Sequence, residues 1–150
     1  FVIWSVGAGN FQSVRHSVSN NESVQHLVSD NLKIVPFLNE KELASAYILS
    51  TLAIGRAGAG TIFELATFGK PSILIPLERK GGDQPVNASA YAKSLATIVV
   101  REQELDLLTS TIEKILNSDV ELESMSQNAK KFGKIEAANH LAQILLNLTK

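Results

Sequence analysis

A glycine-rich segment near the middle of the chain has residue types that suit the binding of a phosphate group. Residues 55–60 hold three glycines, and the segment then continues as a short helix that stops at Gly69-Lys70-Pro71. Glycine lets the backbone come close to a ligand, and the free N–H groups and positive dipole end of a helix attract anions. The segment is neither a P-loop nor a Gly-x-Gly-x-x-Gly fingerprint, since no Gly-Lys-Ser/Thr closes it. We therefore predict a phosphate-binding turn of another kind.

Two carboxylates, Glu64 and Asp83, lie on the helix after this turn and on a later polar loop. A carboxylate is an acceptor of hydrogen bonds from a ligand or from the backbone. Each of the two has a purely structural interpretation. Thr61 and Glu64 have the spacing of a capping box, and Asp83 could cap the helix that Pro85 begins. Arg56 could equally be a solvated strand end.

Composition excludes several classes of function. The chain has 150 residues, 45% hydrophobic content and a net charge of −1, which predicts one globular domain and no general basic surface for nucleic acid. It has no cysteine, and its three histidines lack metal-ligand spacing, so we expect no zinc site. No apolar run approaches the roughly 20 residues that span a bilayer, and no signal peptide is visible, which favours a cytoplasmic location.

Strand and helix patterns alternate along the chain. Strands are expected at residues 2–7, 33–38, 52–54, 72–76 and 97–100. Helices are expected within residues 11–30 (one or two), after the capping-box pattern of residues 39–42, after the glycine turn, from Pro85 onward, and three times before the C-terminus. This order predicts an α/β fold, a Rossmann-like parallel sheet with helices on both faces, with ligands bound at the carboxyl ends of the strands. Trp4 and Tyr91 are expected in the core.

Three segments carry a resemblance to a known family. They are Arg-Ala-Gly-Ala-Gly-Thr-Ile-Phe-Glu (residues 56–64), Gly-Lys-Pro-Ser-Ile-Leu-Ile-Pro (69–76) and Asp-Gln-Pro-Val-Asn-Ala (83–88). Together they resemble the C-terminal, donor-binding domain of the MurG-type glycosyltransferases (GT-B fold, family 28), which transfer N-acetylglucosamine (GlcNAc) from UDP-GlcNAc to a lipid-linked acceptor. The likeness follows the order of elements over nearly the whole chain and is weak before residue 33.

The resemblance implies a role for particular residues. Glu64 matches the family's glutamate that binds the ribose hydroxyls of uridine, and Leu38 matches a position whose backbone faces uracil. Asp83 and Gln84 match a pair that faces the donor sugar. Arg56 matches an arginine before the glycine turn, and Asn87 matches an asparagine that helps to set the loop. The remaining residues of the predicted donor site match positions at the turn beside the diphosphate: Gly58, Ala59, Gly60 and Thr61.

Two departures from the family pattern stand out. Ala57 and Gly60 occupy positions where many members have serine and a larger residue. The chain also begins inside an apolar strand at Phe1, without methionine. We therefore expect a fragment that lacks the first strand, the family's first glycine-rich loop, the acceptor domain and the general base.

The function implied is UDP-GlcNAc binding for inverting transfer to the peptidoglycan precursor lipid I. The resemblance implies no cofactor and no obligatory metal, no transferase activity in the isolated chain, and a full-length protein at the inner face of the cell membrane. Alternatives are another UDP-sugar enzyme of the same fold, a eukaryotic subunit of the same type, or a UDP-GlcNAc 2-epimerase. A non-enzymatic alternative is a nucleotide-binding module with a degenerate site.

Overall fold

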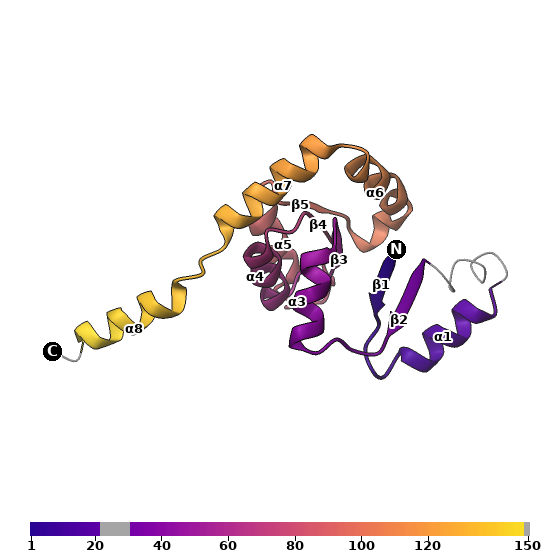
Figure 1. The fold of residues 1–150 in the computed structure, drawn as a ribbon, viewed down its shortest axis with the longest axis horizontal. Helices are drawn as coiled ribbons and strands as arrows, with labels where there is room; N and C mark the ends of the chain where they lie inside the picture. Colours follow the sequence, from indigo (N-terminus) through magenta and orange to yellow (C-terminus); the bar gives the residue numbers. More distant parts are fainter. Residues whose placement is uncertain (22–30, 149–150) are drawn as a thin grey trace. The chain divides into compact units, whose positions relative to one another are not determined.

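The computed structural model describes residues 1–21 and 31–148, which fall into two compact units (Figure 1). The N-terminal unit comprises Phe1–Leu49 and the C-terminal unit Ser50–Lys150. Whether they form the single domain expected from chain length stays a prediction.

The N-terminal unit contains a two-stranded parallel sheet. Its elements are β1 (Val2–Ser5), α1 (Phe11–Ser19), β2 (Leu32–Val35) and α3 (Glu40–Leu49). β1 pairs in parallel with β2, with Val2 opposite Leu32 and Ser5 opposite Val35. The expected strand at residues 33–38 is wrong at its C-terminal end, because Pro36 has no N–H to extend the ladder. α1 confirms a helix in the first part of residues 11–30, and residues 22–30 lie outside the described residues.

The start of α3 confirms the predicted capping box. The Asn39 side-chain oxygen accepts a hydrogen bond from the Glu42 backbone N–H at 3.0 Å, and a Glu42 carboxylate oxygen accepts one from the Asn39 N–H at 2.9 Å. This reciprocal pair satisfies two N–H groups at the helix start.

The C-terminal unit is built on a three-stranded parallel sheet in the order β3-β4-β5. Its elements are β3 (Ala53–Gly55), α4 (Ala59–Phe68), β4 (Ser72–Leu74), α5 (Gln84–Ala92), β5 (Thr97–Val99), the 3-10 helix η1 (Glu102–Leu107), α6 (Leu108–Leu116), α7 (Asp119–Phe132) and α8 (Ala137–Leu148). In register, Ile54 lies opposite Ile73, and Ile73 opposite Ile98. Parallel strands alternating with helices confirm the predicted α/β class, although the described strands form two sheets.

The core of the C-terminal unit covers both faces of β4. Ile73 joins a buried cluster with Val100, Ile115 and Met125, which brings α6 and α7 onto one face of the sheet. Side chains alternate along a strand, so Ser72 and Leu74 point to the other face, and both are also fully buried. Burial on both faces explains why Ile73 and Leu74 are both apolar, and Ser72 is a buried polar residue in the same strand.

The two aromatic residues expected in the core behave differently. Tyr91 is fully buried, with its ring edge-on to Phe132 at a centroid distance of 4.8 Å. Trp4 is 45% exposed, so its assignment to the core is wrong. The physical reason is that, among the residues that the structure describes, β1 pairs with β2 alone, and all four residues of β1 are exposed.

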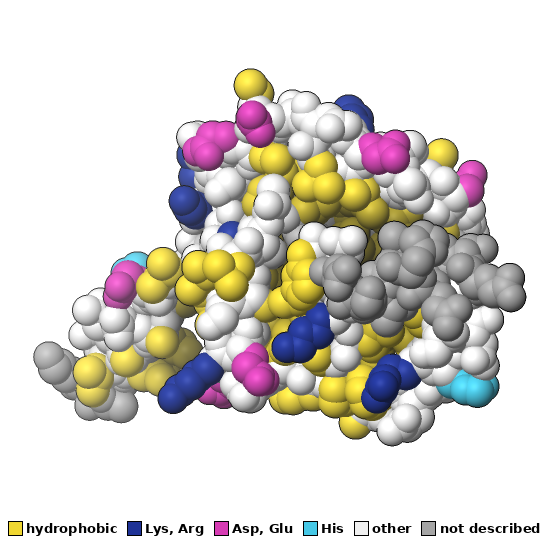
Figure 2. All heavy atoms as spheres, turned by 45° about the vertical axis from the view of Figure 1, so that its right-hand side comes forward, with side chains coloured by type: hydrophobic (Ala, Val, Ile, Leu, Met, Phe, Trp, Pro, Cys, Tyr) yellow, Lys and Arg dark blue, Asp and Glu magenta, His cyan; other side chains and the backbone are white. Residues whose placement is uncertain are grey.

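Helix α8 forms where the amphipathic pattern predicts it, but its apolar side chains are exposed. Figure 2 shows yellow side chains along this helix, which ends at the grey C-terminal residues. The exposed members are Leu141, Ile144, Leu145, Leu146 and Leu148. Within the described parts of the chain, no helix is both long enough and apolar enough to cross a membrane.

Candidate functional site

The glycine turn connects the end of β3 to the start of α4. Gly58 is the N-cap residue, with φ −67° and ψ 146°, and its carbonyl accepts the first helical hydrogen bond, from Ile62 N–H at 3.1 Å. Glycine has no side chain with which to cap the earlier N–H groups of α4. These groups lie at the positive end of the helix dipole, and an anion is a suitable partner for them.

Packing does not explain why residues 58 and 60 are glycine. A Cβ built on Gly60 would meet no described atom within 4 Å, and one on Gly58 would meet only Thr61 Oγ1 at 3.8 Å. Neither is among the glycines with positive φ, which are Gly7, Gly69 and Gly81 in the described chain. Space around the turn is thus open for a ligand that approaches the backbone closely.

The capping-box interpretation of Thr61 and Glu64 is wrong. The helix begins at Ala59, so both residues lie inside it and Thr61 cannot be its N-cap. Gly60 and Thr61 precede Glu64 by four and three residues, which places all three on one side of α4. The Glu64 side chain is exposed on that side, one turn from the helix start.

The loop between β4 and α5 contacts the glycine turn. Asn87 Nδ2 donates to the carbonyl of Ala57 at 3.3 Å, which joins the first turn of α5 to the turn after β3. Gln84 Oε1 accepts from the Leu77 N–H at 2.9 Å and closes the loop on itself. Asp83 is the N-cap residue of α5, but its side chain makes no capping hydrogen bond to any described residue, so that structural alternative is wrong.

Arg56 is held by contacts within the protein. Its Nη1 lies 2.7 Å from Oε1 of Glu102 and donates to the carbonyl of Ile75 at 3.2 Å. Glu102 was not predicted from the sequence, because no local pattern links it to Arg56, which is 46 residues away. The available signal was a carboxylate three residues beyond β5, at the same edge of the sheet.

The C-terminal unit therefore brings most of the predicted donor-site residues to one edge of its sheet. Gly58, Ala59, Gly60, Thr61 and Glu64 lie on the turn and α4, Arg56 follows β3, and Asp83, Gln84 and Asn87 lie at the start of α5. Leu38 belongs to the N-terminal unit, where it is half-buried between β2 and α3.

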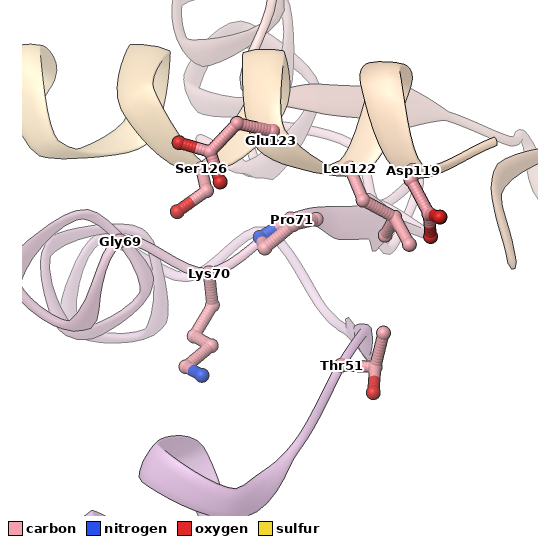
Figure 3. Close-up of a pocket in the computed structure, with 8 residues that line it drawn as sticks. All are labelled: Thr51, Gly69, Lys70, Pro71, Asp119, Leu122, Glu123 and Ser126. Atoms are coloured by element: carbon pink, nitrogen blue, oxygen red, sulfur yellow. The ribbon is translucent and has the colours of Figure 1, made fainter.

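An open hollow lies at the opposite edge of this sheet, before β3 and β4 (Figure 3). Thr51, Lys70 and Pro71 line it together with Asp119, Glu123 and Ser126 of α7. The Lys70 side chain points away from these α7 residues, and its Nζ donates to the carbonyl of Ser50 at 2.9 Å. Burial, and to a lesser degree the charge of Lys130, lowers the pKa of Lys70. None of the predicted donor-site residues lines this hollow.

Comparison with known proteins decides the family. Residues 1–141 match the model of the glycosyltransferase family 28 C-terminal domain. The chain belongs to this family. The predicted family membership and fold are thereby confirmed.

Relatives within the family are longer than this chain. A UDP-N-acetylglucosamine–N-acetylmuramyl-(pentapeptide) pyrophosphoryl-undecaprenol N-acetylglucosamine transferase of Listeria monocytogenes is 42% identical over 104 residues, which is 67% of this chain and 28% of the relative. The transferase of the same name from Halothermothrix orenii is 32% identical over 152 residues, covering 99% of this chain and 40% of the relative. The chain thus spans well under half the length of these family members.

The family fold is also found in a solved structure. The crystal structure of Acinetobacter baumannii MurG matches with a TM-score of 0.74 and 24% identity, covering 97% of this chain and 40% of that one. At this identity the match supports the fold alone.

Proposed function

We propose that this chain binds UDP-GlcNAc, and that the protein containing it transfers GlcNAc to a lipid-linked peptidoglycan precursor, converting lipid I to lipid II. The observation that carries the proposal is the open glycine turn leading into α4, with Glu64 exposed one turn further on, in a member of family 28. The family relatives are named for the transfer of N-acetylglucosamine to this type of acceptor.

The proposed division of roles follows the chemistry of the donor. The first N–H groups of α4, at residues 59–61, bind the diphosphate, and the Glu64 carboxylate accepts hydrogen bonds from the ribose hydroxyls. Asp83 and Gln84 lie at the start of α5, where their polar groups serve the sugar hydroxyls. The assignment of uracil to the backbone at Leu38 rests on the family resemblance and stays a prediction.

The reaction is an inverting displacement at C1 of the donor sugar. The acceptor hydroxyl attacks C1, the bond to the diphosphate breaks, and UDP leaves with the negative charge that develops. Preorganised N–H groups at the N-terminal end of α4 stabilise that charge, which lowers the barrier without requiring a metal ion. The absence of a required metal and cofactor is part of the proposal.

The remaining groups are proposed to come from outside this chain. The acceptor cleft and the general base belong to the rest of the protein, which is consistent with the chain spanning 28% and 40% of two relatives. A lipid-linked acceptor places the whole enzyme at the inner face of the cell membrane. The isolated chain should therefore bind UDP without transferring sugar.

The test is a titration of UDP against the wild-type protein and Glu64→Ala. An unpaired ribose should reduce the free energy of binding by about 1–3 kcal/mol, or roughly fivefold to 150-fold in affinity. Glu113→Ala, an exposed glutamate on α6, is the matched control and should bind UDP like the wild type. Equal affinity in wild type and Glu64→Ala would show that the ribose assignment is wrong.

A second variant tests the turn independently. Gly60→Ala introduces a methyl group that the fold accommodates, since no described atom lies within 4 Å of it. Alanine also favours a helix over glycine by about 0.5–1 kcal/mol, so thermal stability should hold or rise. UDP affinity should fall at least about tenfold if the diphosphate approaches this backbone. Unchanged UDP affinity in Gly60→Ala would show that the diphosphate does not bind at the turn.

A further inference from the structure

The segments that follow the three strands of the C-terminal unit are joined by one arginine side chain. Arg56 follows β3, Ile75 follows β4, and Glu102 begins η1 after β5. Arg56 Nη1 contacts both others, at 2.7 Å to Glu102 Oε1 and 3.2 Å to the Ile75 carbonyl. The Ile75 N–H donates to the Gly55 carbonyl at 2.8 Å, so the backbone at the end of β3 is tied to β4 as well.

A second set of contacts closes the same network. Gln103, next to Glu102 on η1, donates from Nε2 to Glu78 Oε2 at 3.0 Å, and Glu78 lies in the loop between β4 and α5. Asn87 of α5 then donates to the Ala57 carbonyl at 3.3 Å. η1 therefore contacts both the residue that opens the glycine turn and the loop that carries Asp83 and Gln84.

We propose that Glu102 is a positioning residue for donor binding and that it acts through Arg56. The proposal rests on the function proposed above. Glycine turns lose much backbone freedom when they become ordered, so a fixed residue immediately before the turn reduces the freedom left to be lost on binding. The guanidinium is rigid and planar, and engaging it on a carboxylate and a carbonyl fixes residue 56 two positions before the N-cap Gly58.

The same contacts give Arg56 a role different from the direct ligand contact that the resemblance implies. A carboxylate 2.7 Å from Nη1 offsets the positive charge that a phosphate would otherwise meet. The side chains of Arg56 and Glu102 are 50% and 33% exposed, so solvent screens the pair and its effect on the site is modest. Direct binding and positioning predict different patterns when the two residues are replaced separately and together.

The experiment is a double-mutant cycle in the full-length protein, with Arg56→Ala, Glu102→Ala and the double variant. Each single variant should raise the KM for UDP-GlcNAc about threefold to fivefold, and the double variant should do no more than either. The KM for the acceptor and kcat should stay near wild type, since a positioning role at the donor turn affects donor binding. Glu102→Gln keeps an acceptor oxygen and should lose less than Glu102→Ala.

Asp106→Asn is the matched control, because Asp106 is an exposed carboxylate on the same η1 helix. It should leave the donor KM unchanged. Amide hydrogen exchange without ligand gives a readout that does not depend on the reaction. Residues 57–62 should exchange faster in Arg56→Ala and Glu102→Ala than in wild type or Asp106→Asn.

Three results would overturn the inference. An Arg56→Ala loss many times larger than that of Glu102→Ala, with additive losses in the double variant, would mean that Arg56 binds the donor directly. A lower kcat at unchanged donor KM in Glu102→Ala would mean a general structural defect. Glu102→Ala could also leave both the donor KM and the amide exchange unchanged while the wild type still binds UDP. That result would show that Glu102 has no role in donor binding. A wild-type protein that binds no UDP would instead overturn the proposed function, and this inference with it.

Discussion

Strands β1 and β4 are similar in composition but differ in burial. β1 reads Val-Ile-Trp-Ser and all four residues are exposed, whereas β4 reads Ser-Ile-Leu and all three are buried. β4 lies between β3 and β5 and has buried side chains on both of its faces, while β1 has one strand neighbour among the described residues. An apolar strand thus indicates side chains that need to be buried, and in the described residues it is β4, not β1, whose side chains are buried.

The same difference extends to the units that contain these strands. Every buried hydrophobic residue of the described chain lies between Ala57 and Ala129, in the C-terminal unit. That unit also carries the glycine turn, Glu64 and the start of α5, so the predicted donor site stands on a packed core. A site on a packed core can hold N–H groups in place, which is what stabilisation of a leaving diphosphate requires.

The largest expected effect comes from removing the same side chain in each sheet. Ile73 is fully buried and Ile3 is 42% exposed. Ile73→Ala should lower the free energy of unfolding by about 2–5 kcal/mol, because a cavity forms among Val100, Ile115 and Met125. Ile3→Ala should lower it by less than about 1 kcal/mol. Urea unfolding of the 150-residue chain measures both.

Equal losses from the two replacements would break the contrast between the units. A sharper version repeats Ile3→Ala in the full-length protein. A loss there that approaches the Ile73→Ala value would mean that residues outside this chain cover β1.

Local sequence patterns predicted most of the fold of both units. All five strands and their parallel pairing were predictable from apolar runs that alternate with helices. The Asn39–Glu42 capping box was predictable because its partners lie three residues apart. Burial was not fully predictable. Trp4 and Tyr91 are both aromatic residues within apolar patterns, and only the tertiary structure around each decides whether it is buried.

The residues of the candidate site were likewise predictable where they are close in sequence, and not where only the fold brings them together. The glycine turn and Glu64 are consecutive in sequence, and the spacing of Gly60 and Glu64 implies one helix side. The Thr61–Glu64 capping box is wrong because the helix starts at Ala59, with Gly58 as its cap. Glu102 escaped prediction because its partner Arg56 is 46 residues away, and only the fold brings them together.

A smaller effect is expected from glycines in the two units. Gly69 ends α4 in the left-handed region with φ +61°, and a Cβ there would lie 2.5 Å from Cε of Lys130. The lysine chain can move aside but the backbone strain remains, so Gly69→Ala should lower the free energy of unfolding by about 1–2 kcal/mol.

Gly9 has no positive φ and a Cβ would meet no described atom within 4 Å. Gly9→Ala should therefore change stability by less than about 0.5 kcal/mol, by thermal or urea unfolding. Similar losses at both glycines would contradict the view that left-handed backbone strain at Gly69 causes the larger loss.

The smallest effect tests the core of the C-terminal unit through its response to alkali. Burial raises the pKa of Tyr91 from its ordinary value of 10.0 to about 12, so the folded state holds the phenol proton more tightly than the unfolded state. The corresponding stability is complete below pH 10 and is lost as the pH rises towards 12. At about pH 11, wild type should have lost about 1 kcal/mol relative to Tyr91→Phe.

Tyr91→Phe is a suitable partner because it keeps the ring that packs edge-on against Phe132. The Tyr91 hydroxyl is buried and has no hydrogen-bond partner among the described residues, so its removal should be neutral or slightly stabilising at neutral pH. Urea unfolding from pH 7 to pH 11 should therefore give a difference in unfolding free energy between the two proteins that is constant well below pH 10 and changes above about pH 10. A parallel decline of both curves would mean that water reaches the phenol in the folded state, and that this core is more open than its packing indicates.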